Sequence, residues 1–180
     1  MGVLYDYFSA ASDEEAVSVI DRVGGPGSPA TIVPPPEPTR GIFGRKRRPA
    51  ATTNGTDPEQ TVFDTVSGNG IDPFVQLGTL EELLTGKSID DVMDDPRSGH
   101  AVADRDGGER LVLTLTDALS AALASATDEA LEQVAVPWSQ TEEFWDAADP
   151  ADLAGFLKDL ASLARRSETS GQRLYCWVCV

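Results

Sequence analysis

The chain closes on an unbroken apolar run, Leu174-Tyr175-Cys176-Trp177-Val178-Cys179-Val180. A run of β-branched, aromatic and small apolar residues favours a strand, and the lack of polar alternation indicates burial on both faces. We therefore expect this strand near the centre of a sheet. Two further runs predict strands, one at the opening of the chain (Val3–Phe8) and one in its middle (Leu111–Leu115).

Helices are predicted for most of the remaining sequence. Asp149-Pro150 combines an N-cap with proline at the first helical position, and apolar residues then recur at helical spacing through Leu153, Phe156, Leu157 and Leu160. Three capping boxes predict further helix starts, and single caps predict others; the boxes are Ser12–Glu15, Thr79–Glu82 and Ser139–Glu142, and the single caps are Ser88, Thr116, and Thr127 or Asp128.

These elements predict an α+β fold: a small mixed sheet that includes both terminal strands and is packed by several helices, in one domain over residues 1–180. Two stretches resist assignment. Val62–Val66 fits a strand or the first turns of a helix. Residues 97–110 are polar and turn-rich, with Gly107-Gly108 as a hairpin or loop signal.

A proline-rich basic segment interrupts this pattern at residues 26–60. Pro34–Pro38 favours polyproline II, and a basic run follows between Arg40 and Arg48. We expect a disordered or mobile surface loop. Its partner-binding candidates are Phe43, Arg45, Lys46, Arg47 and Arg48, for nucleic acid, membrane or an acidic partner. The alternative is a solvated insertion without a binding role.

Charge is the strongest compositional signal. The chain has 30 acidic and 14 basic side chains, a net charge of −16. Residues 31–60 hold five bases and three acids, so the rest of the chain carries −18. A body this acidic repels phosphate backbones and anionic membranes, and it suits a cationic protein partner. Nucleic acid is therefore expected as a partner only through the basic loop.

The sequence also bears on location. The N-terminal residues have no positive region followed by a long apolar run, and no stretch approaches the ~18 apolar residues that a membrane span requires. We expect a cytoplasmic protein without a membrane span. The excess of Asp over Glu and of Arg over Lys is typical of bacteria with GC-rich genomes.

Cys176 and Cys179 form a C-x-x-C motif, but neither usual interpretation of that motif fits. A redox pair needs a following helix, and only Val180 follows. A zinc site needs two more ligands, and the single histidine, His100, lies in a polar loop. We expect both cysteines to be structural, and no metal or cofactor.

The best candidate for a binding surface is the segment from Pro137 to Asp146. It brings together aromatic and acidic residues, Trp138, Glu142, Glu143, Trp145 and Asp146. Paired carboxylates can hold a divalent cation or act as acid and base. The alternative is that the acids favour a helix N-terminus while both tryptophans fill the core.

Tyr5 and Tyr7 share one face of the first predicted strand and are candidates for lining a cleft; packing in the core is the alternative. No G-x-S-x-G, P-loop or G-x-G-x-x-G motif occurs. No motif therefore fixes a reaction, and the sequence leans away from catalysis.

Several short patterns resemble the YfbM-like family of uncharacterised bacterial proteins. They are the Met1-Gly2-Val3 opening, Leu83-Leu84-Thr85-Gly86, Leu115-Thr116, Pro137-Trp138, the helix through Phe156, Leu160 and Ala164, and the strand after Gly171. The resemblance implies a compact α+β fold and no particular activity. The basic insertion and the C-x-x-C ending depart from it.

Three functional hypotheses follow. The first is a non-catalytic interaction or regulatory protein, conceivably of immunity type, that neutralises a cationic partner. The second is a small-ligand binder or enzyme that uses the Trp138–Asp146 region. The third is a contact with nucleic acid or membrane through the Arg40–Arg48 loop.

Overall fold

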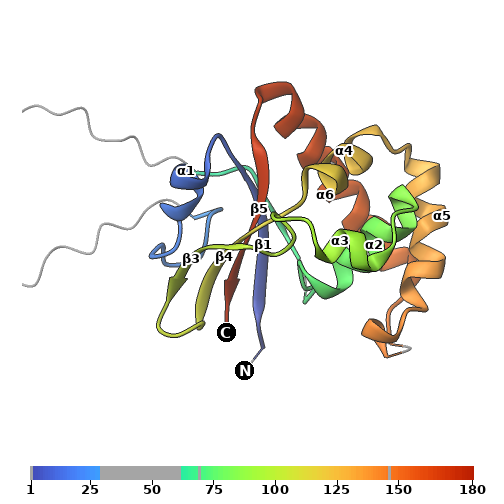
Figure 1. The fold of residues 1–180 in the computed structure, drawn as a ribbon, viewed down its shortest axis with the longest axis horizontal. Coiled ribbons are helices and arrows are strands. Elements are labelled where there is room, and N and C mark those ends of the chain that lie inside the picture. The colour runs from blue at the N-terminus through green and yellow to red at the C-terminus, as the bar shows by residue number, and fades with distance from the viewer. Residues whose placement is uncertain (1, 29–61, 69, 146) are drawn as a thin grey trace, which may run out of the picture.

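The computed structural model describes residues 2–28, 62–68, 70–145 and 147–180. Five strands form one sheet in the order β2-β1-β5-β4-β3, and every pairing is antiparallel rather than mixed (Figure 1). Their bounds are β1 Leu4–Ala10, β2 Thr65–Ser67, β3 Ala101–Arg105, β4 Arg110–Thr114 and β5 Arg173–Cys179. The predicted α+β class, with both terminal strands in the sheet, is confirmed.

The closing strand β5 is the central strand, as its sequence indicates. It pairs with β1 on one side and β4 on the other. Its residues from Leu174 to Val178 are all buried because helices cover one face of the sheet and an N-terminal segment covers the other. The two chain ends lie side by side at one end of the sheet (Figure 1).

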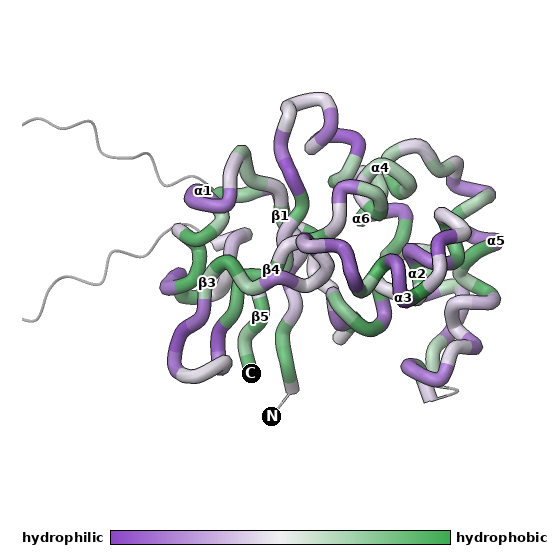
Figure 2. Tube along the Cα trace, in the orientation of Figure 1, coloured by the Kyte–Doolittle hydropathy of each residue, from purple (hydrophilic) through white to green (hydrophobic). Residues whose placement is uncertain are grey.

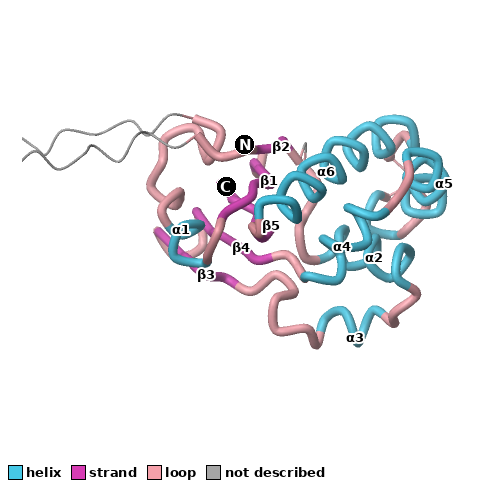
Figure 3. Tube along the Cα trace, turned by 90° about the horizontal axis from the view of Figure 1, so that it is seen from above, coloured by secondary structure: helices cyan, strands magenta, loops and turns pink. Residues whose placement is uncertain are grey.

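Six α-helices and one 3-10 helix are present in the described residues. They are α1 Asp13–Val17, α2 Val75–Thr85, α3 Ile89–Met93, α4 Asp117–Ser125, α5 Asp128–Ser139, η1 Glu142–Phe144 and α6 Pro150–Ser170. Figure 3 shows α1 on one side of the sheet and the other helices on the opposite side. None of the helices is long and apolar enough to cross a membrane.

Each face of the sheet has its own hydrophobic core. On the helical face, Tyr7, Cys176 and Val178 pack against α2, α4, α5 and α6. On the other face, Phe8 and Trp177 pack with Val19, Ile20 and other residues of the N-terminal segment and with Phe63. In Figure 2, apolar residues are concentrated along the central strands and polar residues toward the β3–β4 hairpin.

Side-chain caps begin most of the helices where the sequence predicts them. Ser12, Ser88, Thr116 and Thr127 each accept a hydrogen bond from the backbone N–H three residues on, and Asp149 accepts one from Ala151 N. These caps satisfy amide donors that would otherwise lack a partner in the first turn.

Two capping boxes are wrong. Helix α2 begins at Val75, four residues before Thr79, because the Asp72 carboxylate accepts hydrogen bonds from Phe74 N and Val75 N, both at 2.8 Å. Ser139 is the last residue of α5 rather than a helix start, and its hydroxyl donates to Val136 O. Both segments match the sequence pattern of a capping box, but neither forms a capping box at a helix start in the structure.

The two ambiguous stretches become strands. Thr65–Ser67 forms β2, and the polar stretch before Gly107-Gly108 contains β3, which pairs with β4 across a hairpin. The flanks of the basic insertion are joined by a hydrogen bond from Phe63 N to Pro26 O of 3.1 Å. The candidates Phe43, Arg45, Lys46, Arg47 and Arg48 lie outside the described residues.

Candidate functional site

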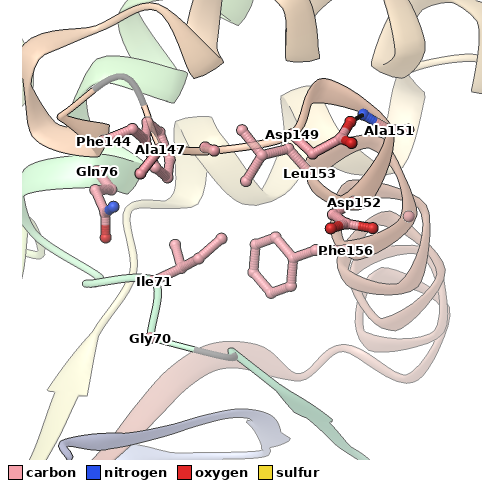
Figure 4. A pocket seen from close by; sticks show the side chains of 12 residues that line it. Gly70, Ile71, Gln76, Phe144, Ala147, Asp149, Ala151, Asp152, Leu153 and Phe156 are labelled. Atoms are coloured by element: carbon pink, nitrogen blue, oxygen red, sulfur yellow. Dashed lines mark hydrogen bonds between the residues drawn. The ribbon is translucent and has the colours of Figure 1, made fainter.

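A groove with a volume of about 610 Å³ lies beside the N-terminal half of α6 (Figure 4). We call it the α6 groove. One wall comes from Gly70, Ile71 and Gln76, which precede or begin α2. The other wall comes from the segment between Phe144 and Phe156. Grooves of this volume are typical of ligand sites.

Aromatic side chains form the base of the groove. Phe144 and Phe156 line it, and Trp138 packs behind both, edge-on to Phe144 at a ring-centroid distance of 5.1 Å and stacked on Phe156 at 6.5 Å. Tyr7 contacts Phe156 at 5.6 Å. The predicted residues Tyr7 and Trp138 are thus fully buried supports of the groove rather than part of its surface.

Two buried hydrogen bonds hold the near wall in place. The Tyr7 hydroxyl donates to Ile71 O at 2.6 Å, and Trp138 Nε1 donates to Gln76 O at 2.9 Å. Because a buried polar group without a partner is costly, each aromatic side chain fixes both itself and the backbone that it contacts. Side chains of the hydrophobic core therefore hold the near wall of the groove in position.

The predicted residue Tyr5 does not line the groove but contacts Asp72, next to the near wall. It is half-buried, and its hydroxyl donates to Asp72 Oδ2 at 3.3 Å. Burial, followed by the nearby Asp72 charge, raises the pKa of Tyr5. Asp72 also caps α2, so this contact connects β1 to the start of the helix.

The rim of the groove is acidic. Asp149 caps α6 through a 2.8 Å hydrogen bond from Ala151 N to its Oδ1, and Asp152 follows in the first turn. Carboxylates are favoured there because the helix N-terminus is electropositive. Asp152 has no ion-pair partner among the described residues, and no lysine or arginine lines the groove.

A glycine keeps the α6 wall open. Gly155 lies inside a helix, where glycine costs about 1 kcal/mol relative to alanine. A Cβ at this position would meet no atom within 4 Å, so packing does not require the glycine. Gly155 lines the groove, so its absent side chain leaves this part of the wall open.

Trp145 is the most unusual aromatic residue in the fold. Its side chain is 87% exposed, and its backbone has φ 54, in the left-handed region that bulky residues rarely adopt. It lies between the groove residues Phe144 and Ala147. The interpretation in which both tryptophans fill the core is therefore correct for Trp138 and wrong for Trp145.

The acidic side chains predicted from the same segment lie elsewhere. Glu142 and Glu143 belong to η1; Glu142 is exposed, Glu143 is half-buried, and neither lines the groove. Asp146 lies outside the described residues. Of the predicted segment, Phe144 lines the groove and Trp138 packs behind it, whereas Asp149 and Asp152 were not among the predicted site residues, although Asp149-Pro150 is visible as a helix start.

Metal and thiol chemistry find no support in the described part of the chain. No three or more His, Cys, Asp or Glu side chains there are placed to hold a metal ion. Cys176 faces the helical core and Cys179 packs on the opposite face of the sheet, so the two thiols cannot pair. Burial raises the pKa of Cys176, which disfavours its reactive thiolate form.

The sequence matches no family model, and no similar curated protein or solved structure was found.

Proposed function

We propose that this chain is a non-catalytic binding protein whose α6 groove receives a basic segment of a protein partner. One observation carries the proposal: the groove combines an aromatic base with two rim carboxylates and has no cationic side chain in its lining. A lysine or arginine side chain satisfies both features, because its apolar stem packs on aromatic rings while its charged head meets the carboxylates.

The charge of the whole body supports the same partner class. Five basic and four acidic residues fall outside the described residues, which leaves a net charge of −17 on the described part. Such a field accelerates association with a cationic partner. The exposed Trp145 is well placed as an aromatic contact beside the groove, since aromatic anchors are common at interfaces.

A cytoplasmic location is part of this proposal, supported by the free thiols of Cys176 and Cys179. An immunity-type role, membership of the YfbM-like family and a nucleic-acid or membrane contact through residues 40–48 stay predictions. A small cationic ligand is the second candidate for the groove, favoured by its volume of about 610 Å³.

The test is binding of a fluorescein-labelled hexa-arginine peptide, followed by anisotropy at physiological salt, with a hexa-glutamate peptide as the charge control. We expect the Asp149→Asn and Asp152→Asn variants each to weaken binding about threefold, because each removes one exposed ion pair. Asparagine still caps a helix, so Asp149→Asn keeps the fold.

Glu129→Gln is the matched control, since Glu129 is an exposed first-turn acid of α5 away from the groove. Equal weakening by Glu129→Gln would show that only net charge matters, and the groove would not be the site. Arginine methyl ester that binds as tightly as the peptide would favour the small-ligand alternative.

A further inference from the structure

A second hollow lies further along the same helix and shares no lining residue with the α6 groove. This hollow has a volume of about 390 Å³ and is lined by Thr65, Val66 and Ser67 of β2 and by Asp159, Ser162 and Arg166 of α6. The α6 groove begins at Gly70, where the chain leaves β2, and ends at Phe156, one turn before Asp159. Together the two hollows follow the seam between residues 65–71 and α6; Figure 3 shows β2 beside this helix.

The outer edge of β2 offers unpaired backbone groups to this seam. Hydrogen bonds from Ser9 N to Asp64 O and from Gly68 N to Tyr5 O fix the alternation between β1 and β2. In that register the backbone N–H and C=O groups of Asp64, Val66 and Gly68 point toward β1. The backbone N–H and C=O groups of Thr65 and Ser67 therefore point away from the sheet. No described residue bonds to these four groups.

The opposite edge of the sheet is less suited to a new strand. Strand β3 shifts register between Ala101 and Ala103 and carries Asp104 and Arg105, which are devices that discourage edge pairing. Strand β2 shows no such irregularity over its three residues. The β3 edge thus carries a register shift and charged residues that β2 lacks, whereas the protection of the β2 edge is its short length of three residues.

The charges in the seam match a basic occupant. Arg166 is paired with Asp64, with Arg166 Nε and Asp64 Oδ2 2.5 Å apart. Asp159 is exposed and has no ion-pair partner among the described residues. Three carboxylates along this side of α6 therefore have no cationic partner in the described part of the chain: Asp149, Asp152 and Asp159.

We propose that the partner binds as an extended basic strand that pairs with the outer edge of β2 and continues along α6 into the groove. This inference rests on the proposed function and names its binding mode. Backbone hydrogen bonds to Thr65 and Ser67 supply affinity, and alternate side chains reach the carboxylates. A segment of seven residues spans about 23 Å, within the ~31 Å length of a 21-residue helix such as α6.

The test uses the full chain and a labelled Ac-Val-Arg-Val-Arg-Val-Arg-Val-amide peptide, followed by anisotropy. Ser67→Pro removes the outward N–H of Ser67 and leaves the pairing with β1 intact, because proline is tolerated at such edge positions. We expect Ser67→Pro to weaken binding about tenfold, and clearly more than Ser67→Ala, which removes the hydroxyl from the hollow but keeps the N–H. N-methylation of alternate peptide residues should weaken binding to the native chain similarly.

The outcomes separate strand addition from groove binding. If Asp152→Asn weakens binding but Ser67→Pro does not, strand addition is wrong while the proposed function stands. If neither variant nor N-methylation has an effect, both are wrong. A dimer of this chain that Ser67→Pro dissociates would also overturn the proposal, since a second copy would then occupy the edge. Equal melting temperatures for Ser67→Pro and Ser67→Ala show that the edge variant is folded.

Discussion

At the residue scale, Trp145 combines a left-handed backbone, which forms the C-cap of η1, with an exposed aromatic ring. A large side chain at φ 54 costs free energy, and an 87% exposed ring recovers little of it by packing. Residues in such conformations gather at binding sites, and Trp145 lies beside the α6 groove. The C-cap position accounts for the backbone conformation, and the exposure of the ring is explained if the ring contacts a partner.

Replacing Trp145 with glycine tests the cost of its backbone conformation separately from the binding role of its ring. We expect Trp145→Gly to raise the free energy of unfolding by about 0.5–1 kcal/mol, because glycine adopts positive φ freely, and to weaken peptide binding. Trp145→Ala should weaken binding without the gain in stability. Urea denaturation measures the first effect and anisotropy the second. Binding by Trp145→Gly as tight as by the native chain would contradict the anchoring role.

At the element scale, Glu81 connects α2 to the start of α4. Its carboxylate is 1% exposed and accepts a hydrogen bond from the hydroxyl of Thr116, the N-cap of α4. Oε1 has no hydrogen-bond partner among the described residues, and the nearest cation, Lys87 Nζ, is 3.9 Å away. Burial raises the pKa of Glu81 more than the Thr116 hydrogen bond and Lys87 lower it.

This contact predicts a pH dependence of stability. Because the folded pKa of Glu81 lies above the unfolded one, the folded state binds the proton more tightly. Glu81 therefore stabilises the fold below the usual glutamate pKa, and this contribution is lost as the pH rises through the folded pKa. We expect Glu81→Gln to remove this part of the pH dependence and to be more stable than the native chain at neutral pH. Chemical denaturation at pH values from 4 to 8 measures it, and identical slopes for both proteins would refute it.

The sequence predicts some helices and strands of this fold better than others. The caps at Ser12, Ser88, Thr116 and Asp149 were predictable because capping depends on a few neighbouring residues. The strand β3 was not, because its residues are polar and its order comes from pairing with β4. Thr79 was misleading because Asp72 caps the same helix earlier.

The candidate site was likewise only partly predictable from the sequence. Its far wall lies in one continuous stretch, so the sequence indicated Trp138 and the residues after it. Its near wall comes from Ile71 and Gln76, more than 60 residues away in the chain. The hydrogen bonds of Tyr7 and Trp138 and the shared hydrophobic core bring the walls together, and no local pattern predicts such long-range contacts.

At the scale of the whole molecule, the two faces of the sheet have different neighbours. The helical face holds the larger core and the α6 groove, whereas the other face is covered by the N-terminal segment and Phe63, whose chain leads to the basic insertion. The flanks of residues 29–61 nevertheless reach the acidic seam along α6, because Asp64 pairs with Arg166 of that helix.

The central claim is that a basic segment binds along α6, rather than to the acidic surface in general. The most direct measurement is a titration of the ¹⁵N-labelled protein with the valine–arginine peptide, followed by amide chemical shifts. We expect saturable amide chemical-shift changes that are concentrated at Thr65, Ser67, Gly70 and the first turns of α6. Shifts spread over distant acidic sites, such as α3 and the β3–β4 turn, would contradict it.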